Sequence, residues 1–237
     1  MPLAAACTGR TEAHLCDAAD GAALGARVHA DVVAPLRALR EAARAEGFDL
    51  ALASGFRSFE RQLGIWNRKV AGELPVLDDA GRPLDIARLS PRALAFAILR
   101  WSALPGASRH HWGTDVDVYD AAATPAGYAV QLVPAEVDAG GMHAPLHAWL
   151  DARIAAGEAF GFHRPYDVDR GGVAPERWHL SHAPVARDFA GTLTREVVAE
   201  ALAAAPMRLR EVVLASLDEI VARFVHNVAP PPAGAHG

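Results

Sequence analysis

Hydrophobic residues recur along this chain with two different periods. In residues 22–46, 58–72 and 90–104 they return about every 3.6 positions, which is the spacing of an amphipathic helix. A serine stands at the start of the second and third stretches, where it can cap a helix. We expect Pro35 to kink or divide the first helix, because proline removes a backbone donor.

A period of two indicates strands. After Gly113 the sequence TDVDVYD places Asp115 and Asp117 on one face of a strand and two valines on the other. The sequence WHLSHAP at 178–184 alternates in the same way, and the short apolar stretch 48–56 is typical of a buried strand. These stretches predict a small sheet.

The C-terminal part of the chain is expected to be helical. Residues 144–161 predict one helix and 186–226 predict more, of which 209–225 is strongly amphipathic. We expect that last helix to pack on its own domain rather than to form a dimer seam. Its apolar face would consist of Leu209, Val212, Val213, Leu217, Ile220, Val221 and Phe224.

Helices that flank a small sheet make an α+β fold. The chain has neither an internal repeat nor a clean linker, so we expect a single domain over 1–237. Its core would span about 22–190, followed by a C-terminal helical extension over about 190–226 and a tail at 227–237.

Composition narrows the classes of partner. Hydrophobic residues make up 51% of the chain and charged residues 22%, which predicts a packed globular core. The net charge of −5 gives no reason to expect nucleic acid or an anionic membrane as partner. Arg61, Arg68 and Lys69 are interpreted as a solvated helix face. Cys7 and Cys16 fit no metal or disulfide pattern, and we expect buried or inert thiols.

The location of the protein in the cell is predicted from the length of its hydrophobic stretches and from its first residues. None approaches the ~20 apolar residues of a membrane span. The first residues do not have the pattern of a secretory signal peptide. We therefore expect a cytoplasmic protein, or a periplasmic one if a leader is missing from the sequence.

Two short polar stretches carry the candidate chemistry. SRHHWGTDVD (108–117) and ERWHLSH (176–182) hold four histidines and three acidic residues. A catalytic zinc ion keeps three imidazole or carboxylate ligands and a water, and a further carboxylate can take the proton of that water. These two stretches would supply that set. A solvated polar cluster is the alternative, and spacing alone does not decide between them.

The same stretches resemble motifs of the VanY-type zinc carboxypeptidases, the D-Ala-D-Ala carboxypeptidase group of the LAS peptidases. SRHHWGTDVD matches SxHxxGxxxD, ERWH matches ExxH, and SGFRSFERQ (54–62) resembles S-G-[YF]-R-[ST]-x-x-x-Q. The motifs follow the family's order and cover about 50–185. The resemblance implies a small, mainly antiparallel sheet with flanking helices.

The resemblance also implies a catalytic role for each matched residue. His110, Asp117 and His179 would bind one zinc ion per chain. Glu176 would be the general base that activates the water and later protonates the leaving amine. Arg57 would stabilise the oxyanion of the tetrahedral intermediate.

Substrate contacts are implied in addition. Arg57, Gln62 and Ser108 would surround the terminal carboxylate and the backbone of a peptide. Trp178 would either wall the pocket or pack in the core.

The remaining polar residues near the motifs depart from the family pattern. Asp115 would either orient a zinc-binding histidine or cap a surface, and we favour a structural role. His111 is expected to be an exposed or hydrogen-bonded bystander, and His182 to face away from the metal. Surface or structural positions are expected for His143, His147 and His163.

The sequence therefore predicts a zinc carboxypeptidase that releases terminal D-alanine from peptidoglycan stem peptides or recycled muropeptides. Cutting a tetrapeptide (L,D-carboxypeptidase) and cutting a D-Ala-D-Ala end (D,D-carboxypeptidase) both stay open. The alternatives are an endopeptidase of the same group and a binding module without catalysis. The expected partner is a peptidoglycan-derived peptide, and the chain is expected to be a monomer or a homodimer.

Overall fold

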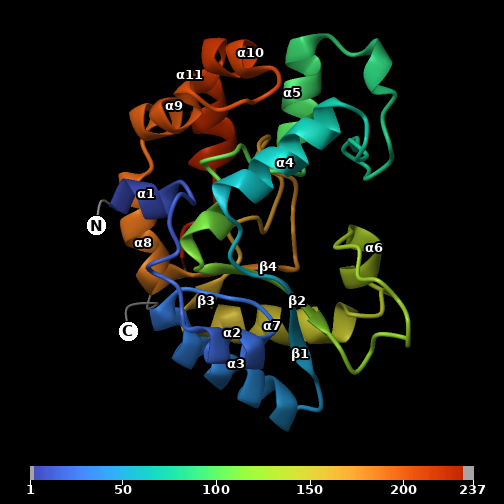
Figure 1. Ribbon diagram of the computed structural model, residues 1–237. Helices are drawn as coiled ribbons and strands as arrows, with labels where there is room; N and C mark the ends of the chain where they lie inside the picture. The colour runs from blue at the N-terminus through green and yellow to red at the C-terminus, as the bar shows by residue number, and fades with distance from the viewer. Residues whose placement is uncertain (1–2, 232–237) are drawn as a thin grey trace.

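The computed structural model describes residues 3–231 and has an open four-stranded antiparallel sheet at its centre (Figure 1). The strand order is β1-β2-β4-β3, and all three neighbouring pairs are antiparallel. The strands are β1 (Leu50–Ser54), β2 (Asp115–Asp120), β3 (Phe162–His163) and β4 (His179–His182). The expected α+β fold is confirmed, with one addition, since the sequence does not predict the two-residue β3.

Strand β2 divides its side chains between two faces of the sheet. Val116 and Val118 are fully buried on the face that we call the packing face. Asp115 and Asp117 lie on the opposite face, which we call the site face. Because β2 and β4 pair with Asp117 opposite His179, the two polar motifs of the sequence meet on the site face.

Two apolar cores lie on either side of this sheet. On the packing face, α3 (Val33–Ala45) and α7 (Ala144–Ala156) contribute leucines that cluster with the sheet valines. A second cluster joins α4 (Phe59–Val70), α5 (Pro91–Leu99) and the C-terminal helices. Figure 1 shows α2, α3 and α7 on one side of the sheet, and α4, α5 and α9 to α11 on the other. The site face is therefore enclosed by the second group.

The first predicted helix is two helices. Residues 18–24 form α2 (Ala18–Leu24), which ends at Gly25 in the left-handed region (φ 88°). After the 3₁₀ turn η1 (Ala30–Val32), α3 begins at Val33. Pro35 therefore lies in the first turn of α3, where the missing N–H costs nothing, and the break comes at Gly25 instead.

Serine caps begin α4 and α5 as predicted. Ser58 Oγ accepts from the backbone N–H of Arg61 at 3.2 Å, and Ser90 Oγ accepts from that of Ala93 at 3.2 Å. Helix α5 ends at Leu99 rather than at 104, and α4 ends at Val70.

The predicted helix 209–225 is also divided. It consists of α10 (Arg210–Ala215), α11 (Leu217–Ile220) and a π-helical turn, η4 (Val221–Val225). Its apolar residues belong to the second core, so packing on its own domain is confirmed. Ahead of it come α8 (Ala183–Thr192) and α9 (Arg195–Ala203). The division into a core and an extension stays a prediction.

The predicted tail is only partly described. The backbone N–H of Ala229 donates to Pro165 O at 2.8 Å, so the start of the tail packs on the domain. Residues 232–237 lie outside the described residues.

Short elements complete the description: α1 (Leu3–Cys7), η2 (Ile86–Arg88), η3 (Arg109–Trp112) and α6 (Pro134–Val137). Cys7 and Cys16 are buried free thiols, as expected. Within residues 3–231 no helix has the length and apolar character to cross a membrane.

Candidate active site

A pocket of about 270 Å³ opens over the site face. Its polar lining comes from segments far apart in the sequence: the turn after β1, the last turn of α4, η3, β2 and the approach to β4. The pocket contains seven of the eight sequence-predicted site residues: Arg57, Ser108, His110, Asp117, Glu176, Trp178 and His179.

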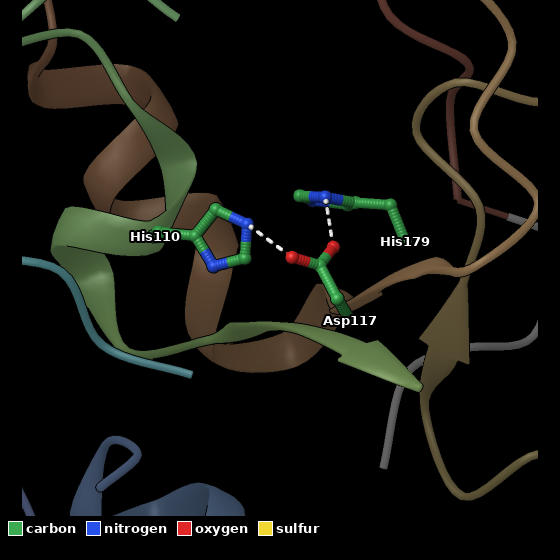
Figure 2. Close-up of side chains that lie close together, drawn as sticks. All are labelled: His110, Asp117 and His179. Atoms are coloured by element: carbon green, nitrogen blue, oxygen red, sulfur yellow. Dashed lines mark ion pairs between the residues drawn. The ribbon is translucent and has the colours of Figure 1, made fainter. Parts of the chain in front are cut away.

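Three donor side chains converge in this pocket (Figure 2). His110 Nε2 lies 3.3 Å from Asp117 Oδ2, and His179 Nδ1 lies 3.2 Å from Asp117 Oδ1. One ligand atom from each of the three residues lies within 4.8 Å of the other two. All three residues are buried, so they meet in a confined space and not on an open surface.

Each histidine is oriented by the ring nitrogen that faces away from Asp117. His110 Nδ1 lies 2.9 Å from Gly55 O, which can only accept a hydrogen bond, so Nδ1 carries the proton. His179 Nε2 lies 2.9 Å from Asp115 Oδ1, which fixes its proton in the same way. The other nitrogen of each ring is therefore free for a ligand.

Asp115 is held in turn by its surroundings. It is fully buried and accepts from Arg109 Nε at 2.7 Å and from the hydroxyls of Thr114 and Ser181. Burial raises the pKa of Asp115, but the charge of Arg109 and the hydrogen bond from His179 outweigh burial and hold the pKa well below its usual range. Asp115 thus orients His179, and the alternative that it caps a surface is wrong.

The three donors fit a zinc ion. Asp117 Oδ1 is buried and has no hydrogen-bond partner among residues 3–231. Burial lowers the pKa of His110, so its ring is neutral and presents a lone pair. Burial would also lower the pKa of His179, but Asp115 and Asp117 raise it to about 10, so a cation is favoured at its Nδ1. Two imidazole nitrogens and a carboxylate oxygen are the protein donors of catalytic zinc sites.

Glu176 stands beside the donors without belonging to them. Its Oε2 lies 3.6 Å from His179 Nδ1, and its side chain is 13% exposed. Burial raises the pKa of Glu176 to about 7. A carboxyl group with that pKa can both accept and return a proton near neutral pH.

Arg57 enters the pocket from a rigid support. Its Nη1 donates to Gln62 Oε1 at 2.9 Å and its Nη2 donates to Ser54 Oγ at 3.1 Å. Its backbone O accepts from His111 Nδ1 at 2.6 Å. His111 is thus a hydrogen-bonded bystander, as expected, and it fixes the main chain that carries Arg57.

Gln62 does not reach the pocket surface. It is fully buried, its Oε1 accepts from Arg57, and its Nε2 donates to Ala103 O at 2.7 Å. Both ends of its amide are therefore occupied. The structure corrects the predicted substrate contact, because Gln62 positions Arg57 from behind.

Ser108 and Trp178 do line the pocket. Ser108 is 1% exposed, and its Oγ has no hydrogen-bond partner within the described part of the chain. Its hydroxyl is therefore available to a bound molecule. Trp178 is 4% exposed and contributes to the wall, so it packs in the interior and faces the pocket at once.

The sequence missed three titratable side chains of the pocket: Lys69, Arg109 and Tyr166. Lys69 is seven positions after Gln62, so the helical period of α4 could have placed it on the inward face. Arg109 forms an ion pair with Asp115. The ring of Tyr166 lies 5.0 Å from that of His179. Tyr166 comes from a loop, where no periodic pattern signals the direction of a side chain.

The other histidines lie outside the pocket. The ring of His182 contacts Phe162 on the packing face, as its alternation with His179 predicts. Three further histidines were expected at surface or structural positions, and the structural alternative holds because all are at most 5% exposed: His143, His147 and His163.

One family of known proteins matches most of the chain. The family model described as VanY, D-alanyl-D-alanine carboxypeptidase, matches residues 25–185. That range contains all three motifs and every residue of the candidate site.

Individual relatives match in part. An uncharacterized protein of Haemophilus influenzae is 42% identical over 97 residues, which is 41% of this chain and 66% of that protein. A D-alanyl-D-alanine carboxypeptidase of Enterococcus faecalis is 28% identical over 167 residues, which is 68% of this chain. The match spans only 50% of the Enterococcus protein's length.

A solved structure shares the fold. The structure of VanYB in complex with D-alanine-D-alanine superposes with a TM-score of 0.50 at 22% identity, and the match covers 86% of this chain and 90% of that one. At this level of identity the likeness supports the arrangement of helices and strands.

Proposed function

This chain belongs to the VanY family of D-alanyl-D-alanine carboxypeptidases, and from that premise we propose that it is a zinc-dependent hydrolase. It releases terminal D-alanine from peptidoglycan stem peptides or from recycled muropeptides. The convergence of His110, Asp117 and His179 beside Glu176 is the observation that carries this proposal.

The metal would be held by His110 Nε2, Asp117 and His179 Nδ1. Zinc bound there supplies a Lewis acid for the scissile carbonyl and lowers the pKa of a bound water to about 7. The protein contributes the fixed tautomers of both rings, through Gly55 O and Asp115. Because these partners are themselves buried, the ligands are in place before any substrate binds.

Glu176 moves the proton in this proposal. With a pKa of about 7, its carboxylate accepts a proton from the attacking water and then returns it to the amine of the leaving residue. His179 contacts Glu176 at 3.6 Å, which keeps the base next to the metal ligands without making it one of them.

Arg57 stabilises negative charge on the carbonyl oxygen as the tetrahedral intermediate forms. Gln62 and Ser54 occupy its terminal nitrogens on one side and aim the guanidinium. A donor fixed before the reaction stabilises the transition state without reorganisation, which is the basis of oxyanion stabilisation.

A panel of peptides tests the proposal. The zinc-loaded protein is incubated with a pentapeptide that ends in D-Ala-D-Ala and with the tetrapeptide that ends in a diaminopimelate–D-Ala bond, and free D-alanine is measured. Release from the first assigns D,D-carboxypeptidase action, and release from the second assigns L,D-carboxypeptidase action. The inactive Glu176→Gln protein is the control for background hydrolysis.

Two results would reject the carboxypeptidase. Cleavage inside the stem, with no free D-alanine, would favour the endopeptidase. Binding of the peptides by the zinc-loaded protein with no cleavage at all would favour the binding module. The presence of Glu176 and Arg57 beside all three donors argues against the binding module. Location in the cell and oligomeric state stay predictions.

A further inference from the structure

The pocket contains one cation that the protein leaves uncommitted. Arg109 is bound to Asp115 and Ser181, and Arg57 is bound to Gln62 and Ser54. Lys69 lines the same pocket but forms no hydrogen bond and no close ion pair with residues 3–231. Its ammonium group is therefore free to bind a ligand.

Lys69 is also chemically distinct from every other cation of the chain. It is the only lysine among the 23 lysine and arginine residues. An ammonium group on a flexible stem is a compact point charge, whereas a guanidinium is a planar fork that must be oriented. The one position at which the chain has the point charge is a wall of the candidate active site.

The helix explains why this lysine points inward. Gln62 and Trp66 are fully buried on one face of α4, and Lys69 follows at the next position of that face. Lys69 is half-buried and lines the pocket, so the interpretation as a solvated face is wrong for Lys69, whereas Arg61 and Arg68 are exposed as expected. Leu77, Trp101 and Val173 line the pocket together with it, and such apolar walls strengthen a charge interaction by excluding water.

Lys69 shares its pocket with Glu176, the group that must contact the leaving residue. Glu176 has to reach the amine of that residue to protonate it, which requires contact at about 3 Å. In an α-amino acid a single carbon joins this amine to the carboxylate. A leaving residue in contact with Glu176 therefore has its carboxylate in the same pocket of about 270 Å³ that Lys69 lines.

We propose that Lys69 binds the α-carboxylate of the terminal D-alanine and makes a free C-terminus the preferred substrate. This rests on the proposed function, since it assigns Lys69 to the leaving residue of that reaction. Lys69 would make the contact with the carboxylate that the sequence assigned to Gln62. The amide of Gln62 is occupied at both ends, by Arg57 and by Ala103 O. Lys69 is thus a specificity-determining residue, and Ser108 is a neutral group in the same pocket lining.

Kinetics with matched substrates tests this. Lys69→Met keeps the apolar stem and removes the charge, and Lys69→Arg keeps the charge. On a peptide that ends in free D-Ala-D-Ala, Lys69→Met should lose about ten- to a hundredfold in kcat/KM, as expected for a charged hydrogen bond. On the C-terminal amide of that peptide it should match the unmodified enzyme. Lys69→Arg should keep most of the preference for the acid.

A second readout uses the single lysine as its own probe. In zinc-loaded Glu176→Gln protein, which does not turn over the ligand, Lys69 is acetylated and the modified peptide is quantified by mass spectrometry. D-Ala-D-Ala should slow the acetylation of Lys69, and its C-terminal amide should not. The N-terminal amine is the internal control, since its acetylation should not change.

The outcomes separate this inference from the proposed function. Equal losses of Lys69→Met on acid and amide, or no loss on either, would overturn the role of Lys69 while D-alanine release upheld the function. If D-Ala-D-Ala but not its amide slows the acetylation of Lys69, while the unmodified protein releases no D-alanine, Lys69 binds the carboxylate and the proposed function is overturned. Equal acetylation of Lys69 with and without D-Ala-D-Ala would overturn the role of Lys69 in binding the carboxylate and would leave the proposed function standing.

Discussion

The two faces of the central sheet use the same strands for opposite purposes. On the packing face, Val116, Val118 and Leu180 are fully buried against apolar side chains. On the site face, Asp117 and His179 alternate with those residues and are also buried, at 4% and 3% exposed, yet they are polar. Burial of polar groups is costly unless they find partners.

The site face meets that cost with a particular set of partners. Asp115 and Gly55 O occupy the outer nitrogen of each histidine, so that the inner nitrogens and Asp117 face one another. Val116, Val118 and Leu180 need no polar partner, whereas Asp117 Oδ1 has no hydrogen-bond partner among residues 3–231 and, in the proposed function, would meet a zinc ion. Apolar packing therefore fixes the position of the strands, and the polar partners fix the orientation of the side chains on the site face.

Paired substitutions of two histidines on β4 should give the largest contrast. His179→Ala removes a metal donor from the site face and should abolish both stoichiometric zinc binding and turnover. His182→Ala, three residues later on the packing face, should keep the zinc and lose only stability. Metal analysis of the purified proteins measures this. Full zinc in His179→Ala would break the comparison.

Replacing the base should have the next largest effect. Glu176→Gln should keep zinc and fold but lose about 10²–10⁴-fold in kcat, the usual contribution of general acid–base catalysis. Glu200→Gln, on an exposed position of α9, is the matched control and should be unaffected. Near-normal turnover in Glu176→Gln would mean that another group activates the water.

The orienting carboxylate should affect the metal more mildly. Asp115→Asn weakens the acceptor that fixes His179 and should lower zinc affinity about 10–100-fold, as for other partners of metal-binding histidines. Asp120→Asn changes a carboxylate on the packing side of the same strand, where it accepts from the backbone N–H of Asp49 at 3.0 Å. Competition with a chelator should show a loss of affinity in the first variant only.

The smallest effect concerns a histidine of the packing side, His147 on α7. Burial lowers its pKa to about 2, with help from the charges of Arg164 and Arg177. The unfolded chain binds this proton near pH 6.5, so the free energy of unfolding should fall as the pH drops below 6.5, by up to about 1.4 kcal/mol per unit.

Denaturant unfolding between pH 7.5 and pH 5 measures this slope. His147→Gln should flatten it relative to the unmodified protein, and His226→Gln, at an exposed position, should not. An unchanged slope in His147→Gln would show that other groups cause the loss of stability in acid.

Local patterns predicted much of this molecule. The alternation of TDVDVYD correctly separated Asp115 and Asp117 from the valines, and the caps of α4 and α5 were visible as serines. The resemblance to the family's three motifs, and not the spacing alone, identified the residues that meet in the pocket.

What the sequence did not give depends on contacts between distant segments. The pairing that places Asp117 opposite His179 is a register between two strands more than 60 residues apart. Gln62 donates to Ala103 O, a partner 41 residues away that no periodic pattern indicates. The first helix breaks at Gly25 because of a left-handed backbone conformation, which no periodic pattern indicates either. Lys69 was misread because its charge suggested solvent, although its helical position pointed inward.

A zinc titration coupled to D-alanine release tests the central claim most directly. The protein is stripped with a chelator, zinc is added back in steps, and D-alanine released from the stem peptides is measured at each step. Activity should be absent without metal, should rise in proportion to the zinc added, and should level off at one equivalent per chain, with no rise in His179→Ala. Full release of D-alanine by the stripped protein would contradict the assignment of the site face as a metal centre.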